Sequence, residues 1–145
     1  MSQLVFDGTE ETLVLIDKNG KSVGSWHANN RTDSHATLHF VPNGSLPFQD
    51  RTAPHRHSAP NADTVNGEYG SFGIIRMMPF DGHAGVGVHA GRANVPDKSI
   101  RRGIGPDHVT QGCIRTTEDA MKAITGVMAQ DPLLTITVKN NRRKR

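Results

Sequence analysis

The sequence predicts a mainly β protein with one principal α-helix, organised as a single domain over residues 1–141. Apolar residues make up only 34% of the chain, and 15 glycines and 8 prolines accompany them, which favours strands and turns over a helix bundle. Helical spacing of apolar residues is seen in one long stretch only. A chain of 145 residues can bury about two thirds of its unfolded surface around one core, so no second domain is required.

The strands are expected in short apolar stretches that turn residues separate. We predict strands at 4–6, 12–16, 22–26, 38–41, 72–77, 85–89 and 134–138, with a further extended piece that begins at Phe48. Asn19-Gly20 predicts the turn between the second and third strands. Two long loops remain, at 50–68 and 92–107; the first is interpreted either as a wall or lid of a binding cleft or as a solvated insertion.

The helix is expected to follow the only cysteine. Thr116 is the predicted N-cap, with Asp119 three residues later, and Asp131-Pro132 is expected to end the helix. Its apolar stripe consists of Ala120, Met121, Ile124, Val127 and Met128. These methionines are interpreted as core residues.

The formal charge of +3 comes from the end of the chain, at 142–145. These four residues are all basic, and without them +3 becomes −1, so we expect a nearly neutral body with a disordered basic tail. No basic stripe interleaved with aromatic residues accompanies the tail, so nucleic acid is not an expected partner. We expect no membrane span and no ordinary signal peptide, and therefore synthesis in the cytoplasm.

Cys113 is the chemically most informative residue, because a lone thiol cannot form an internal disulfide. With a histidine as base it is a candidate nucleophile, although free cysteine is also commonly a small buried hydrophobe. In the strand at 85–89, alternation places His89 on the same face as Gly85 and Gly87, where there is room for a substrate backbone. His108 is the rival base, and we favour His89.

Gly87-Val88-His89 followed by Thr110-Gln111-Gly112-Cys113-Ile114-Arg115 resembles the signature of L,D-transpeptidase catalytic domains. The resemblance implies a β-sandwich or barrel-like fold, with Cys113 as nucleophile and His89 as base. Gln111 stands where that family usually has histidine, and the twenty residues between His89 and Thr110 are somewhat more than its usual spacer.

Each residue of this stretch is given an expected role. His89 takes the thiol proton to give an ion pair, and the backbone N–H groups around Gly112 and Cys113 stabilise the oxyanion. Thr110 positions the turn or the imidazole. Arg115 is expected to hold a substrate carboxylate, the alternative being a surface ion pair with Glu118 or Asp119. Substrate-binding residues are expected to be Arg115, Gln111, His108 and Gly87.

No metal or other cofactor is expected. His35 and His39, or His55 and His57, could suggest a metal, but no His-Glu-x-x-His motif or cysteine cluster accompanies them. They are interpreted as loop and surface histidines, with His57 as a possible wall of the cleft.

The resemblance implies action on peptidoglycan stem peptides, with release of a terminal D-amino acid and transfer of the acyl group to water or to an amine. Peptidoglycan lies outside the cytoplasmic membrane, and small catalytic domains similar to this one occur as antibacterial toxins injected by type VI secretion. The resemblance therefore implies a toxin that acts in the periplasm of a target cell, with a secretion carrier and an immunity protein as partners. A phage-borne wall enzyme, or a chain given without its export signal, would also fit. Two alternatives stay open: a non-catalytic peptidoglycan-binding module, and a cysteine peptidase or amidase that cuts another bond.

Overall fold

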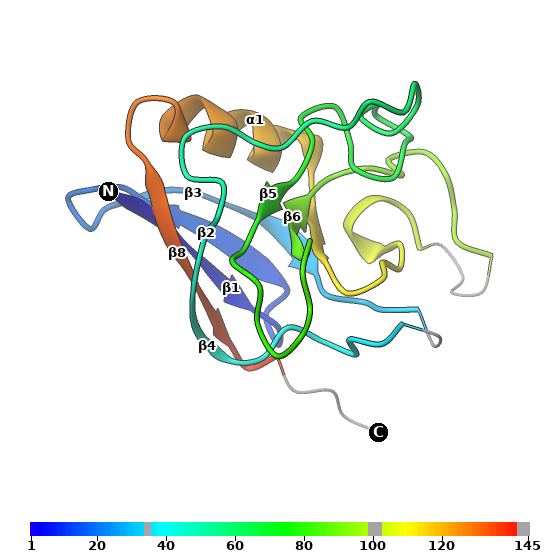
Figure 1. Ribbon diagram of the computed structural model, residues 1–145, viewed down its shortest axis with the longest axis horizontal. Helices are drawn as coiled ribbons and strands as arrows, with labels where there is room; N and C mark the ends of the chain where they lie inside the picture. The colour runs from blue at the N-terminus through cyan, green and yellow to red at the C-terminus, as the bar shows by residue number, and fades with distance from the viewer. Residues whose placement is uncertain (34–35, 99–102, 142–145) are drawn as a thin grey trace.

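The computed structural model describes residues 1–33, 36–98 and 103–141. One sheet contains all the named strands, in the order β4-β8-β1-β2-β3-β7-β6-β5 (Figure 1). The strands are β1 (Ser2–Asp7), β2 (Thr12–Ile16), β3 (Ser22–Asn29), β4 (Gly44–Pro47), β5 (Ile75–Arg76), β6 (Gly87–His89), β7 (Ile114–Thr116) and β8 (Leu133–Lys139). The helix α1 (Glu118–Met128) and the short 3-10 helix η1 (Gly105–Asp107) complete the elements.

The sheet curls until its two edges meet, which makes the fold barrel-like. Just beyond the outer strands, Phe48 after β4 forms an isolated antiparallel bridge with Met77 after β5. Backbone hydrogen bonds from Met78 N–H to the Pro47 carbonyl (2.9 Å) and from Gln49 N–H to the Arg76 carbonyl (2.8 Å) reinforce the junction. Closure removes free strand edges, which would otherwise be open to pairing with other chains. The expected mainly β, barrel-like fold is therefore confirmed.

The first three strands form an antiparallel meander, as the turn residues predict. Between β2 and β3, Asp17 N–H donates to the Lys21 carbonyl (2.9 Å), and Gly20 takes the positive φ of 79° that the turn requires. Alternation along β1 and β2 directs Leu4, Phe6 and Leu13 into the core, where each has no exposed surface. β1 also pairs in parallel with β8, so the last strand lies beside the first.

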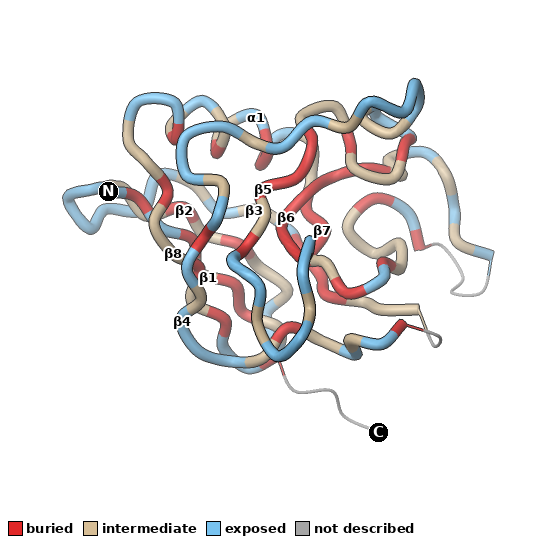
Figure 2. The backbone as a smooth tube through the Cα atoms, in the orientation of Figure 1, coloured by how far each residue is buried: buried red, intermediate tan, exposed pale blue. Residues whose placement is uncertain are grey.

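The helix packs on the sheet through the predicted apolar stripe. Its buried residues are Ala120, Met121, Ile124 and Met128, while Val127 is partly buried. Buried positions, red in Figure 2, gather along β6 and β7 and on the side of α1 that faces the sheet. The predicted N-cap is wrong by one residue, because Thr117 accepts the hydrogen bond from Ala120 N–H (3.0 Å). Thr116 instead ends β7 and donates its hydroxyl to the His27 carbonyl (2.9 Å).

The strand expected at 38–41 is absent, and side chains replace strand pairing there. Val41 N–H donates to the Asn30 Oδ1 (2.6 Å), and the Val41 carbonyl accepts from Asn141 Nδ2 (2.8 Å). The backbone of Val41 is therefore satisfied without a neighbouring strand. The extended piece predicted at Phe48 starts earlier, as β4, and Phe48 itself forms only the closing bridge.

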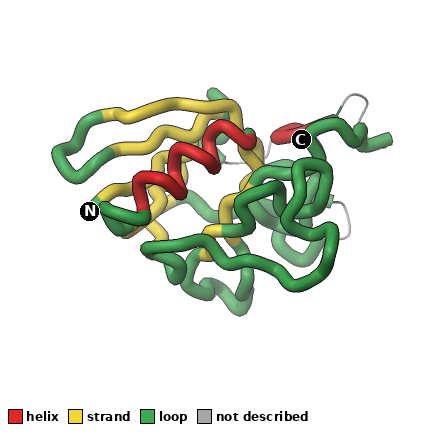
Figure 3. Tube along the Cα trace, turned by 90° about the horizontal axis from the view of Figure 1, so that it is seen from above, coloured by secondary structure: helices red, strands yellow, loops and turns green. Residues whose placement is uncertain are grey.

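Two further strands are shorter than predicted, because β5 keeps only Ile75–Arg76 of 72–77 and β6 only Gly87–His89 of 85–89. The loops gather on the opposite side of the molecule from the β2–β3 hairpin (Figure 3). The predicted basic tail at 142–145 lies outside the described residues. Over the described part of the chain, no helix has the length and apolar character needed to cross a membrane.

Candidate active site

The parallel pair of β6 and β7 brings the two expected catalytic residues to one place. Its register pairs Val88 with Ile114 and His89 with Arg115. Val88 and Ile114 are fully buried and point into the core. Because side chains alternate along a strand, His89 and Arg115 point to the other side of this pair, and Cys113, two residues before Arg115, shares their face.

Cys113 and His89 line the same cleft, which has a volume of about 170 Å³. Glu68, Tyr69 and Gln111 form other parts of its wall. Glu68 is the last residue of the 50–68 loop, so this end of the loop forms part of the cleft wall, as one of its two interpretations predicts.

Cys113 is half-buried, and the surrounding backbone favours its neutral thiol. The Sγ accepts from Gly87 N–H (3.5 Å) and donates to the Gly85 carbonyl (3.9 Å). Burial raises the pKa of Cys113 to about 11, against the lowering effects of the Gly87 N–H and of the Arg115 charge. The thiolate, which is the nucleophilic form, is therefore disfavoured at neutral pH.

His89 is fully buried and is held in one tautomer. Its Nδ1 lies 2.6 Å from the Ala90 carbonyl. A carbonyl only accepts hydrogen bonds, so Nδ1 carries the proton and Nε2 is left as the acceptor. Burial, together with a smaller contribution from the positive charge of Arg115, lowers the pKa of His89 to about 3.

The thiol and the imidazole are thus both neutral at pH 7, which differs from the expected resting ion pair. Burial acts on the two groups in opposite directions, raising the pKa of one and lowering the pKa of the other. A thiolate–imidazolium ion pair is therefore disfavoured at this pH.

Thr110 builds the turn before Cys113. Its hydroxyl donates to the Cys113 carbonyl (2.8 Å) and accepts from Gly112 N–H (3.1 Å). Gly112 has a positive φ of 138°, a backbone conformation that residues with a Cβ rarely adopt. The N–H of Gly112, which the sequence suggested as an oxyanion donor, is thus engaged by Thr110. The N–H of Cys113 and the side-chain amide of Gln111 are the remaining candidates.

Asn30 also stabilises this turn through side-chain hydrogen bonds, a role that the sequence pattern did not reveal. Its Nδ2 donates to the carbonyls of Gly112 and Cys113, both at 2.9 Å, and it is buried. Its Oδ1 accepts from Val41 N–H and from Asn141 Nδ2 (3.0 Å). A buried asparagine with all its hydrogen-bonding groups satisfied restricts the backbone to one conformation.

Arg115 has a structural role, which differs from both expected ones. The side chain is 1% exposed, and its guanidinium donates to backbone carbonyls of Glu68 (2.8 Å), Val109 (2.9 Å), His108 (3.1 Å) and Ala90 (3.3 Å). Neither Glu118 nor Asp119 is among its hydrogen-bond partners; Glu118 accepts from Ser71 N–H instead. Burial lowers the pKa of Arg115 to about 10, so it remains a cation at neutral pH.

The other expected substrate-binding residues lie in different surroundings. Gln111 lines the cleft and is exposed. His108 is not among the residues that line the cleft; its Nδ1 lies 3.2 Å from the Val109 carbonyl and 3.9 Å from Asp97. Gly87 packs against β5, and a Cβ there would lie 2.2 Å from the Ile75 carbonyl oxygen. Glycine is thus needed for the close approach of β5 and β6.

Tyr69 is a cleft residue that the sequence analysis missed. Its ring meets the His89 ring edge-on, with centroids 5.1 Å apart, and its other contact is a parallel stack on His57 at 3.8 Å. His57 is held in turn by Asp63, through Nδ1 and Oδ1 at 2.9 Å. His57 therefore lies behind Tyr69, rather than in the wall of the cleft. No spacing or motif in the sequence links these residues.

Comparisons with known proteins support the fold. The structure resembles an L,D-transpeptidase (Yku) from Stackebrandtia nassauensis, with a TM-score of 0.54 and 14% identity over 97% of this chain and 56% of that one. It also resembles Bd1075 of Bdellovibrio bacteriovorus, with a TM-score of 0.59 and 16% identity over 96% of this chain and 48% of that one. This chain spans about half the length of these two proteins. No protein-family model and no curated protein matches the sequence. The chain therefore has the fold of an L,D-transpeptidase.

The role of Arg115 is tested by Arg115→Lys. An ammonium group cannot reach carbonyls on four residues, so buried acceptors lose their donor, and we expect a loss of roughly 3 kcal/mol or more in the free energy of unfolding. Urea denaturation measures this loss. Arg51→Lys is the control, since exposed Arg51 donates to one carbonyl, that of Phe48, and should change stability by less than about 0.5 kcal/mol. Equal effects of the two substitutions would contradict the structural role.

The protonation state of the site is tested by alkylating Cys113 with iodoacetamide. Only the thiolate reacts, and with a pKa of about 11 its fraction should rise roughly tenfold per pH unit between about pH 7 and about pH 9. Free cysteine, with a pKa near 8.5, is the control and should begin to level off in that range. A rate that is already constant from about pH 6 upward would show a resting thiolate–imidazolium pair instead.

Proposed function

We propose that this protein is a cysteine-dependent acyltransferase of peptidoglycan stem peptides, acting as an L,D-carboxypeptidase, an L,D-transpeptidase or both. One observation supports this most strongly: the only cysteine of the chain and the imidazole of His89 line one cleft, in the fold of an L,D-transpeptidase. Arg115, Thr110 and Asn30 hold the backbone around this pair through the hydrogen bonds described above.

The reaction begins when a peptide carbonyl carbon reaches the Sγ of Cys113. The thiol proton moves to Nε2 of His89 as the S–C bond forms, and the negative charge passes to the carbonyl oxygen. The N–H of Cys113 and the side-chain amide of Gln111 are proposed to stabilise this oxyanion. The C–N bond then breaks, the proton on Nε2 passes to the departing amine, and a thioester to Cys113 remains.

The second half of the reaction releases the acyl group. Water or the amine of another stem peptide gives a proton to Nε2 of His89 as it attacks the thioester carbonyl. The C–S bond then breaks, and the proton on Nε2 passes to the departing sulfur, which restores the thiol of Cys113 and the neutral imidazole. The neutral state of His89 suits this step, because the free lone pair on Nε2 is needed for each proton transfer. Water yields a shortened peptide, and an amine yields a cross-link or an exchanged D-amino acid.

The dimensions of the cleft favour a small terminal residue. A volume of about 170 Å³ lies below the range of about 300–1,000 Å³ that is usual for pockets that enclose a drug-sized ligand. It suits one small residue, such as a terminal D-alanine, with the rest of the stem peptide outside. The carboxylate of that residue would not be bound by Arg115, which is buried and donates four hydrogen bonds to backbone carbonyls.

The proposal is tested by incubating the protein with tetrapeptide muropeptides and analysing the products by mass spectrometry. We expect loss of D-alanine with wild type, no product with Cys113→Ala or His89→Ala, and about 100-fold slower turnover with Gln111→Ala. His39→Ala is the control, because this exposed side chain lies outside the cleft and should leave the rate unchanged.

Two other outcomes would favour the alternatives. Binding of muropeptides without any mass change would indicate a peptidoglycan-binding module, an interpretation that the raised pKa of Cys113 would then explain. Cleavage between two L-residues or at the sugar–peptide amide would indicate a peptidase or amidase. Either result would contradict the L,D-specific reaction.

We further propose that the protein acts in the periplasm of a target cell as a delivered toxin, with a secretion carrier and an immunity protein as partners. The support is chemical, because its proposed substrate lies outside the cytoplasmic membrane. Expression in a bacterium with a fused periplasmic signal should stop growth or cause lysis, and expression without it should not. Cys113→Ala with the same signal is the control, and equal growth of all three strains would contradict the proposal.

A further inference from the structure

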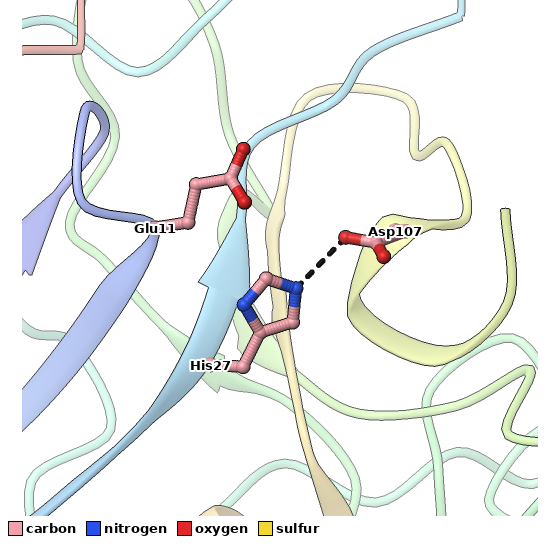
Figure 4. Close-up of side chains that lie close together, drawn as sticks. All are labelled: Glu11, His27 and Asp107. Atoms are coloured by element: carbon pink, nitrogen blue, oxygen red, sulfur yellow. Dashed lines mark hydrogen bonds and ion pairs between the residues drawn. The ribbon is translucent and has the colours of Figure 1, made fainter.

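Three side chains with metal-ligand chemistry meet on the side of β3, outside the cleft. Glu11 lies in the turn between β1 and β2, His27 on β3 and Asp107 in η1 (Figure 4). One ligand atom from each residue can be chosen so that all three lie within 4.8 Å of one another. The imidazole Nε2 of His27 is 2.8 Å from Oδ1 of Asp107.

We propose that Glu11, His27 and Asp107 form a binding site for a divalent transition-metal ion, zinc being the best match. One imidazole and two carboxylates are borderline and hard ligands, the combination that zinc accepts alongside one or more waters. The two carboxylates carry two negative charges, which a dication neutralises. Such a site differs from the histidine pairs considered in the sequence analysis: its histidine is His27, and of the earlier four His35 lies outside the described residues.

The backbone holds the ligands on three separate segments. The antiparallel register of β2 and β3 pairs Thr12 with His27, and Ala28 N–H donates to the Glu11 carbonyl (3.0 Å). These bonds place Glu11 beside His27. The Asp107 carboxylate is oriented by a second donor, Asn29 Nδ2, at 2.5 Å.

A polar cavity of about 360 Å³ adjoins the cluster and provides room for further ligands. Glu11 and Asn29 line it together with Asn30 and Thr32. Water molecules held by these groups can complete the coordination of an ion. Arg31 lines the same cavity, so the site is suited to a single dication and not to two.

A small side-chain movement is enough for coordination. Ligand atoms around a tetrahedral zinc ion with bonds of about 2.0 Å lie ~3.3 Å apart, so the His27–Asp107 hydrogen bond must lengthen slightly while Glu11 closes in. The side chains of His27 and Asp107 are 42% and 36% exposed, which leaves them free to turn. Within the described residues the Glu11 carboxylate has no hydrogen bond or ion pair that it would have to give up.

A bound ion would brace the segment that leads to Cys113. Asp107 is followed directly by His108 and Val109, whose carbonyls accept from Arg115. An ion shared by Asp107, His27 and Glu11 would join this segment to β3 and to the β1–β2 turn. The expected role is therefore structural and does not depend on the proposed acyl-transfer reaction.

The test uses the full chain with Cys113→Ala, so that the thiol cannot bind zinc, after dialysis against EDTA. Isothermal titration with Zn²⁺, Mn²⁺ and Ca²⁺ should show one saturable site, with Zn²⁺ bound most tightly and with a higher melting temperature in its presence. Glu11→Gln should weaken Zn²⁺ binding by about tenfold or more. This substitution keeps the side-chain shape and breaks no contact between described residues, so the fold should persist, which circular dichroism in EDTA verifies.

Two more variants separate this site from other histidines. His27→Ala should weaken Zn²⁺ binding at least as much as Glu11→Gln, and His39→Ala, an exposed histidine outside the cluster, should leave it unchanged. Absence of saturable binding would overturn the proposal. Equal affinity in wild type and Glu11→Gln would overturn it as well, because the ion would then bind elsewhere.

Discussion

The carbonyl of Ala90 is the point on which the site depends, because it accepts hydrogen bonds from both Arg115 and His89. Nε of Arg115 lies 3.3 Å from it and Nδ1 of His89 lies 2.6 Å from it. The same guanidinium also binds carbonyls before β7 and at the end of the 50–68 loop. One buried cation thus holds the carbonyl that fixes the imidazole tautomer, the segment before Cys113 and one wall of the cleft.

This arrangement also determines the electrostatics. A cation near the thiol and the imidazole favours the thiolate and opposes the imidazolium, so Arg115 lowers the pKa of both groups. For Cys113, burial raises the pKa by more than Arg115 lowers it, and the thiol therefore remains neutral. At neutral pH the resting site therefore holds a neutral thiol and a neutral imidazole, and in the proposed reaction the thiol loses its proton only as a substrate is attacked.

Features that depend on residues close together in the sequence could be predicted from it. The meander of β1 to β3, the apolar stripe of α1 and the alternation that puts Val88 in the core all follow from residue spacing and turn chemistry. The Thr-x-Gly-Cys turn was also predictable, since a short hydroxyl side chain readily bonds to the backbone two residues on.

Contacts between distant segments were not predictable in this way. The side chain of Asn30 forms hydrogen bonds both to Val41 N–H and to the carbonyl of Gly112 in the turn before Cys113. An irregular segment at Val41 is therefore found where a strand was expected. Arg115 was expected to bind a substrate. Its burial could not be predicted, because it depends on carbonyls from two loops. Tyr69 and the cluster of Glu11, His27 and Asp107 come together only through the fold, and nothing in their spacing indicates it.

The covalent intermediate gives the most direct test of the central claim that Cys113 and His89 transfer an acyl group. Intact-protein mass spectrometry after millisecond mixing with a tetrapeptide should show a transient adduct with the mass of the peptide minus D-alanine, mapped to Cys113 by digestion. The adduct should be absent in His89→Ala. Product formation without any adduct on Cys113, or an adduct that forms equally fast without the imidazole, would contradict this account.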